Sequence, residues 1–366
     1  MISRRSALTG GVCALAAPFI SRGRFRVFAS TGQEYSARTL ELVRSSTVID
    51  MLGLLTLNYR RLAAWQTQGE LFPAEEFERL QRSGVTIVHP AVGFVKGDVR
   101  RSSLSDMTRW NHFLAANPDR FLRVDGPADL DRVKASGKIG VILGLQNSAH
   151  FETSADVDLF YRLGQRVSQL TYYSNPLGGG STDPACGLSV YGAEVVERMN
   201  RVGMAIDVSH CADRTTLDAI DVSCKPVLVT HSNCRALVPN SVRCKPDEAI
   251  RKMAAKGGVL GITLVRSFVR ANGPATMEHV LQHIDHVVSL AGVEHVGLGT
   301  DVDLVGRDRG GALKLDLDGA DYAQKIYEVA EGLVRRNYSR SNIEAILGGN
   351  FRRALAAIWT NSESRA

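Results

Sequence analysis

Two histidines and an aspartate each end a short apolar run, and these residue types bind and activate metal ions. His210 ends the run 205–210, His231 ends the run 227–231, and Asp301 ends the run 295–301. Buried parallel strands have continuous apolar sequences of this kind, and ligands bind beyond the carboxyl ends of such strands. Two imidazoles and a carboxylate brought together there would begin a zinc centre that activates water for hydrolysis.

Strand-like runs that alternate with helical patterns would position these residues. Amphipathic helices are predicted at 193–199, 214–220 and 277–290, and further helices at 322–334 and 341–358 close the far end. Eight strands alternating with helices predict an α/β fold of the TIM (β/α)8 barrel type rather than an open sheet. The predicted strands are 47–50, 86–90, 139–146, 167–172, 205–210, 226–232, 259–265 and 295–301.

The first 29 residues have the features of a twin-arginine signal peptide. Arg4 and Arg5 precede an apolar stretch at 7–20, which is too short to span a membrane, and small residues allow cleavage after Ala29. We therefore expect a signal peptide at 1–29, a single barrel domain at 30–366 and a periplasmic protein. The alternative is an uncleaved amphipathic start.

The charge of the chain bears on its partners, and its cysteine count bears on disulfide pairing. Residues 1–29 contain five arginines and no acidic residue, so cleavage lowers the formal charge from +6 to +1. We therefore expect no nucleic-acid partner and, after cleavage, no membrane span. Removal of Cys13 leaves five cysteines, so at least one cannot pair within the monomer.

From about residue 50 to residue 353 the chain resembles the membrane (renal) dipeptidases, which are metallopeptidases of the amidohydrolase type. The resemblance implies a barrel of the metal-dependent hydrolase type, a dipeptide or similar small-molecule substrate, and a homodimer. The stretches that carry it are 169–172, 187–189, 203–210, 230–233, 257–261, 299–301 and 348–351.

The resemblance also assigns roles to individual residues. In the family, two zinc ions share a bridging carboxylate, and the histidines that hold one of them match His210 and His231. The arginine that binds the substrate carboxylate matches Arg243, and the acid/base aspartate matches Asp301. A guanidinium group suits a peptide carboxylate because it can donate two parallel hydrogen bonds.

Other family positions have changed. The first-strand ligands of the other zinc ion fall on Leu52 and Leu54, the bridging carboxylate falls on Gln146, and a histidine near the reacting carbonyl falls on Tyr172. Leucine offers no lone pair, and an amide oxygen cannot offset the charge of a dication. We therefore expect one zinc ion, held by His210, His231 and Gln146 or Asp301, with no metal as the alternative.

Single histidines and arginines elsewhere have simpler interpretations. His89 ends a strand and His150 follows Gln146 by four residues, so either is a candidate to replace a lost ligand, although core histidines are commoner. Tyr172 is a candidate donor to an oxyanion as well as a wall of the pocket. Arg235 and Arg243 have the alternative of pairing with acidic residues.

Three functions are consistent with these features. The first is a hydrolase that cleaves dipeptides or related small amides with a metal-activated water, with Asp301 and Tyr172 as catalytic residues and Arg243 as the substrate anchor. The second is a metal-independent isomerase or tautomerase, since one fold hosts many reactions. The third is a non-catalytic protein that binds carboxylates.

Overall fold

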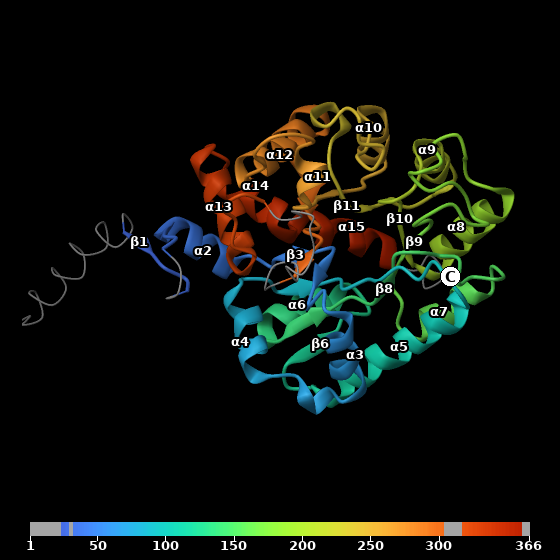
Figure 1. The fold of residues 1–366 in the computed structure, drawn as a ribbon, viewed down its shortest axis with the longest axis horizontal. Helices are drawn as coiled ribbons and strands as arrows, with labels where there is room; N and C mark the ends of the chain where they lie inside the picture. Colours follow the sequence, from blue (N-terminus) through green and yellow to red (C-terminus); the bar gives the residue numbers. More distant parts are fainter. Residues whose placement is uncertain (1–22, 29–31, 304–316, 361–366) are drawn as a thin grey trace, which may run out of the picture.

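Parallel strands and helices alternate along almost the whole chain (Figure 1). The computed structural model describes residues 23–28, 32–303 and 317–360. The strands are β1 (Arg24–Phe25), β2 (Tyr35–Ser36), β3 (Ile49–Asp50), β4 (Gly53–Leu54), β5 (Ile87–Val88), β6 (Phe121–Arg123), β7 (Ile139–Val141), β8 (Gly144–Leu145), β9 (Val167–Gln169), β10 (Ala205–Asp207), β11 (Val229–Ser232), β12 (Leu260–Ile262), β13 (Val296–Leu298) and β14 (Val302–Asp303).

Most helices lie toward the edge of the molecule in Figure 1, whereas the last helix crosses the middle of this view. They are α2 (Ala37–Ser45), α3 (Tyr59–Thr67), α4 (Ala74–Arg82), α5 (Val99–Ala116), α6 (Pro127–Ser136), α7 (Asp156–Arg162), α8 (Val190–Val202), α9 (Asp213–Val222), α10 (Asp247–Ala255), α11 (Arg266–Val269), α12 (Met277–Ala291), α13 (Lys325–Arg335), α14 (Arg340–Glu344) and α15 (Asn350–Trp359), with short turns η1 (Gly69–Leu71), η2 (Arg235–Leu237), η3 (Val293–His295), η4 (Tyr322–Gln324) and η5 (Ala345–Gly349).

Parallel pairing closes the strands into a ring. β3 pairs with β5 and β13, β5 with β7, β8 with β9, β9 with β10, and β12 with both β11 and β13. A bridge between Asp207 and Leu228 joins β10 to β11 and completes the circle. β7 and β8 are two segments of the strand predicted at 139–146. The eight predicted strands are therefore present in the expected order, which confirms the TIM barrel.

Three features differ from the sequence-based expectation. β6 adds a strand beside β7, and its three-residue run ending in Arg123 has no alternation that would reveal it. β1 and β2 form an antiparallel pair apart from the ring. The tail predicted as one helix at 341–358 is broken near Gly348, where a Cβ atom would lie 2.0 Å from the carbonyl oxygen of Thr47.

Helix boundaries follow local sequence signals. α8 covers the predicted segment and is capped by Gly203, whose φ of 81° suits glycine because other residues are strained there. α12 buries its apolar face through Val280, Leu281, Ile284 and Val287. These helices confirm the amphipathic patterns from which they were predicted.

The C-terminal helix closes the end of the barrel where the strands begin. Phe351, Ala354, Leu355 and Ile358 of α15 pack in one cluster with residues at the starts of several strands. The opposite end, where the strands finish, is left for the candidate site.

The N-terminal segment lies largely outside the described residues. Of the predicted signal peptide, the structure describes 23–28, where the Arg24 guanidinium contacts Glu331 and the Phe28 side chain is buried. Among the described residues, no helix combines the length and apolar character needed to cross a bilayer.

Candidate active site

His210 and His231 meet at the carboxyl ends of β10 and β11. His210 follows β10 by three residues, and His231 lies within β11. Their Nε2 atoms are 3.0 Å apart, and their ring planes are tilted by 58°. Two nitrogen ligands of a tetrahedral zinc ion lie about 3.3 Å apart when each Zn–N bond is about 2.0 Å. The histidine pair is therefore close to the spacing that one shared ion requires.

Asp207 and Thr230 hold the ring of His231. The Thr230 hydroxyl donates to Asp207 Oδ2 over 2.7 Å, so its single hydrogen is used. Nδ1 of His231 must then donate to Thr230 Oγ1, which lies 2.8 Å away. Nε2 of the neutral ring therefore carries a lone pair that faces His210. A hydrogen-bonded support of this kind is typical behind a metal-binding histidine.

Both imidazoles are neutral near pH 7. Burial lowers the pKa of His210 and of His231 well below the usual value, and the positive charge of Arg243 lowers each further. The ring of Tyr172 stacks on His210 with centroids 4.1 Å apart. Burial, followed by the negative charge of Asp301, raises the pKa of Tyr172, so this phenol stays protonated and can donate a hydrogen bond.

Arg243 is buried beside the main chain of His231, among main-chain carbonyls. Its Nη1 donates to the carbonyl of Ser209 over 2.6 Å, and Nη2 donates to that of His231 over 2.9 Å. Nε is buried and has no hydrogen-bond partner among the described residues. Arg235 in the same loop instead pairs with Asp213. The structure thus gives Arg235 the simpler role of a loop ion pair and leaves Arg243 with an unused donor.

Asp301 lies between β13 and β14 in a strained backbone conformation. Its φ is 56°, which is uncommon for a residue with a side chain and is often found at functional sites. Its amide donates to the carbonyl of Leu52 over 2.8 Å. The charge of Asp301 acts on the pKa of both Tyr172 and Arg243, which places the carboxylate within electrostatic range of the site.

The residues present do not fit a two-zinc centre. Leu52 is fully buried and Leu54 partly so, and neither can bind a cation. The Gln146 amide nitrogen donates to the carbonyl of Ala91 over 2.8 Å, which engages one end of its side chain. The described part of the chain contains no group of three His, Cys, Asp or Glu side chains placed to bind a metal.

The two further histidines lie in different surroundings. His150 is buried, with Nδ1 donating to the carbonyl of Asn147 and Nε2 3.1 Å from the side-chain amide of Gln165, so both nitrogens lie against groups of the core. The alternative that His150 replaces a lost metal ligand is therefore wrong. His89 is buried and donates from Nδ1 to the carbonyl of Ile142 over 2.9 Å, and its ring packs against Gly144 of β8, where a Cβ atom would lie 2.2 Å from Cε1.

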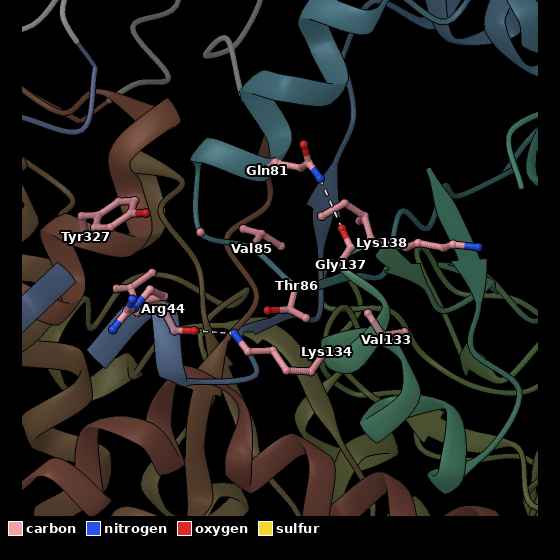
Figure 2. A pocket seen from close by; sticks show the side chains of 12 residues that line it. Arg44, Gln81, Val85, Thr86, Val133, Lys134, Gly137, Lys138 and Tyr327 are labelled. Atoms are coloured by element: carbon pink, nitrogen blue, oxygen red, sulfur yellow. Dashed lines mark hydrogen bonds between the residues drawn. The ribbon is translucent and has the colours of Figure 1, made fainter. Parts of the chain in front are cut away.

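A cavity of about 310 Å³ lies at the other end of the barrel (Figure 2). Its lining includes Thr86 just before β5 and Lys138 just before β7. Lys134 donates there to the carbonyl of Arg44, as the dashed line in Figure 2 shows. Residues at this end of a TIM barrel serve stability rather than chemistry, so we do not place the site there.

Several supporting residues were not identified from the sequence. Asp207 and Thr230 orient His231, while Asp50 and Lys325 form a buried ion pair beside Asp301. Asp207 and Thr230 could have been recognised as polar residues inside apolar strand runs, such as the run 205–210. Lys325 starts a helix far along the chain, and no local pattern marks it.

Comparison with known proteins identifies the family of this chain. The sequence profile of the membrane dipeptidases (peptidase family M19) matches residues 37–366. Dipeptidase tcpJ of Claviceps purpurea is 31% identical over 246 residues, which cover 66% of this chain and 56% of that protein. The chain spans about half the length of the curated relatives it matches.

Solved structures show the same fold. An amidohydrolase from Pseudomonas aeruginosa superposes with a TM-score of 0.76 at 26% identity, covering 88% of this chain and 99% of that one. A metallo peptidase from Rhodobacter sphaeroides, solved with a phosphinate mimic of the dipeptide L-Ala-D-Ala, has a TM-score of 0.71 at 20% identity, covering 86% and 99%. With a profile match across nearly its whole length, this chain belongs to the membrane dipeptidase family of metallopeptidases.

Proposed function

We propose that this protein hydrolyses dipeptides or related small amides at the site formed by His210, His231, Arg243 and Asp301. The observation that carries the proposal is the buried guanidinium of Arg243, whose Nε has no partner among the described residues, beside two neutral imidazoles. Buried donors are nearly always hydrogen-bonded, so an unused one within a candidate site favours a ligand.

Arg243 would bind the C-terminal carboxylate of the substrate. Its Nη atoms are held by the carbonyls of Ser209 and His231, which fix the plane of the guanidinium group. A charge-assisted hydrogen bond to a carboxylate is about twice as strong as a neutral one. The arginine would thereby orient the scissile amide relative to the histidine pair.

His210 and His231 would hold a single zinc ion, with Gln146 as a further ligand. When bound, such an ion lowers the pKa of a coordinated water to about 7 and polarises a carbonyl group. The contribution of the protein is to keep both rings neutral by burial and to hold the Nε2 lone pair of His231 toward the site, since Thr230 occupies its Nδ1.

Asp301 would transfer the proton, and Tyr172 would stabilise the developing negative charge. Asp301 accepts the proton that the attacking water loses and returns it to the leaving amine as the amide C–N bond breaks. The protonated phenol of Tyr172 donates a hydrogen bond to the oxyanion that forms on the carbonyl carbon. The charge of Asp301 helps to keep that phenol protonated, so the two side chains act together.

A turnover assay tests the proposal. Mature protein is incubated with L-L and L-D dipeptides and with zinc, cobalt or manganese, and released amino acids are quantified. L-Ala-D-Ala belongs in the panel because a mimic of it binds the Rhodobacter sphaeroides neighbour. We expect metal-dependent turnover that Asp301→Asn reduces by about 10²–10⁴-fold. Turnover of no dipeptide with any metal would sink the proposal and favour isomerase-type chemistry or plain binding, whereas amino-acid release indifferent to chelators would show hydrolysis without a metal.

We also propose that the protein is exported through a twin-arginine signal and acts in the periplasm as a homodimer. The paired arginines and the small residues before position 30 support export. N-terminal sequencing of protein from the periplasmic fraction tests it, with Ser30 as the expected first residue. Light scattering on the same sample gives the oligomeric state.

A further inference from the structure

A buried ion pair stands at the end of β3, in the half of the barrel where the family resemblance places the first zinc ion. Lys325 Nζ lies 3.0 Å from Asp50 Oδ2, and the two side chains are 2% and 0% exposed. Charges so deeply buried are costly unless they are paired and fully hydrogen-bonded. The hydrogen bonds around each charged group therefore decide whether the burial of this pair can be explained.

Each of the three hydrogens of the Lys325 ammonium group has an acceptor. Besides Asp50, Nζ lies 2.6 Å from Thr300 Oγ1 and 3.3 Å from the carbonyl oxygen of Val302. Carboxylate, hydroxyl and carbonyl oxygens around one positive charge are also the environment that a bound cation finds in proteins. The ammonium group is thus enclosed by oxygen ligands.

The same contacts reach both neighbours of Asp301. Asp50 accepts the amide of Thr300 at Oδ1 over 2.8 Å and the hydroxyl of Thr300 at Oδ2 over 2.6 Å. Lys325 binds the side chain of Thr300 and the main chain of Val302, so it fixes the chain on either side of Asp301. A residue with a φ of 56° needs surroundings that hold it in place.

The positions that follow Asp50 contain leucines. Leu52 and Leu54 stand where the family resemblance expects the histidine and the aspartate that hold the first zinc ion. The Leu52 amide nevertheless donates to Asp50 Oδ1 over 3.3 Å, so the strand end keeps the carboxylate in its network. A negative charge has been retained here, while the side chains that would bind a metal beside it are absent.

We propose that the ammonium group of Lys325 is a built-in cation that serves this half of the site in place of the first metal ion, and that Lys325 is the positioning residue for Asp301. The positive charge balances Asp50 and, through Thr300 and Val302, fixes the backbone that presents the Asp301 carboxylate. The role as a built-in cation stands on the contacts alone. The effect on catalysis rests on the proposed function.

Zinc binding tests the electrostatic part without any substrate. Leu52→His, Leu54→Asp and Gln146→Glu are combined to restore the ligand types of the family, with Lys325 retained or changed to methionine. Both proteins are titrated with zinc in a competition assay against a chelator dye. We expect Lys325→Met to tighten binding of the added zinc ion by at least about tenfold, because a nearby positive charge opposes a second cation. Identical zinc binding with and without Lys325 overturns the proposal.

Unfolding experiments test the pairing of Lys325 with Asp50 even if Lys325→Met is poorly folded. Alone, this change leaves the Asp50 carboxylate buried without its cation, whereas Asp50→Asn/Lys325→Met removes both charges. We expect a higher thermal midpoint for the double variant than for Lys325→Met. Lys252→Met is the control, since it breaks an exposed pair with Asp221 and should leave the midpoint within about 1 °C. Equal midpoints for the single and double variants would contradict the pairing.

Kinetics on any dipeptide that the wild type hydrolyses test the positioning part. Lys325→Met should lower kcat about tenfold or more while KM changes less than about twofold, because substrate binding through Arg243 is untouched. Adding it to Asp301→Asn should cause little further loss. If Lys325→Met lowered kcat by the same factor in the wild type and in Asp301→Asn, Lys325 would act independently of Asp301. If the wild type hydrolyses no dipeptide, the proposed function fails, while the zinc and unfolding experiments still decide the role of Lys325.

Discussion

The Nε2 atoms of His210 and His231 lie 3.0 Å apart, although the two rings come from different strands. Because Nδ1 of His231 donates to Thr230, the hydrogen between the two rings must belong to Nε2 of His210 in the metal-free protein. A zinc ion between them would require both Nε2 lone pairs, so the hydrogen of His210 would move to Nδ1. The pair can therefore bind a metal without losing a proton from either neutral ring.

Removal of either histidine is expected to abolish tight zinc binding. His210→Ala or His231→Ala leaves one nitrogen ligand of the pair, and we expect the purified variant to retain less than roughly a tenth of the wild-type zinc. Elemental analysis of the purified protein measures it. His112→Ala is the matched control because His112 is exposed on α5. Equal zinc content in the wild type and His210→Ala would place the metal elsewhere.

Thr230→Val should weaken zinc binding although Thr230 does not contact the metal. Valine has nearly the same shape but cannot accept the hydrogen of His231 Nδ1 or donate to Asp207. Loss of such a support typically lowers metal affinity by about 10–100-fold. A chelator competition assay gives the ratio. Thr67→Val on an exposed helix is the control, and an unchanged affinity for Thr230→Val would show that the support is unimportant.

Arg243→Lys should affect substrate binding more than Arg235→Lys does. Lysine at 243 loses the planar group that the carbonyls of Ser209 and His231 hold, so we expect KM for a dipeptide to rise about tenfold or more. Arg235 is paired with Asp213 in the same loop, and its replacement should leave KM within about twofold. Steady-state kinetics distinguish the two. A similar rise for both variants would indicate a general loop effect.

Stability should fall in mild acid because of His150. Burial lowers its pKa to about 4, whereas the unfolded chain has the ordinary value near 6.5. Between these values the unfolded state binds more protons, so the free energy of unfolding decreases as the pH falls from about 6.5 to 4. The expected loss is about 3 kcal/mol from this residue.

Urea unfolding at a series of pH values checks this dependence. His150→Gln is less stable at neutral pH, because it loses packing against Phe151 and Phe160, but it should show a shallower decrease in this pH window. His112→Gln should keep the wild-type slope because His112 is exposed. A wild-type slope in His150→Gln would assign the acid sensitivity to other groups.

Periodicity in the sequence was sufficient to predict the barrel. Eight short apolar runs and the helical patterns between them are local features, and the known packing of alternating strands and helices allows few arrangements. Regions where local rules conflict with close packing were predicted less well. The tail helix is broken at Gly348 because the chain approaches the carbonyl of Thr47 there. No pattern in the neighbouring sequence indicates that approach.

By itself, the sequence determined the order of the elements and the strand ends that carry His210, His231 and Asp301, because hydrophobic periodicity and strand direction are encoded locally. Only the tertiary structure decided which distant groups meet these residues. Lys325 reaches Asp50 and the backbone beside Asp301, while Arg243 is bonded to the His231 carbonyl and keeps one donor without a partner among the described residues. Closure of the ring brings residues hundreds of positions apart within hydrogen-bond distance, and burial then sets their charge states.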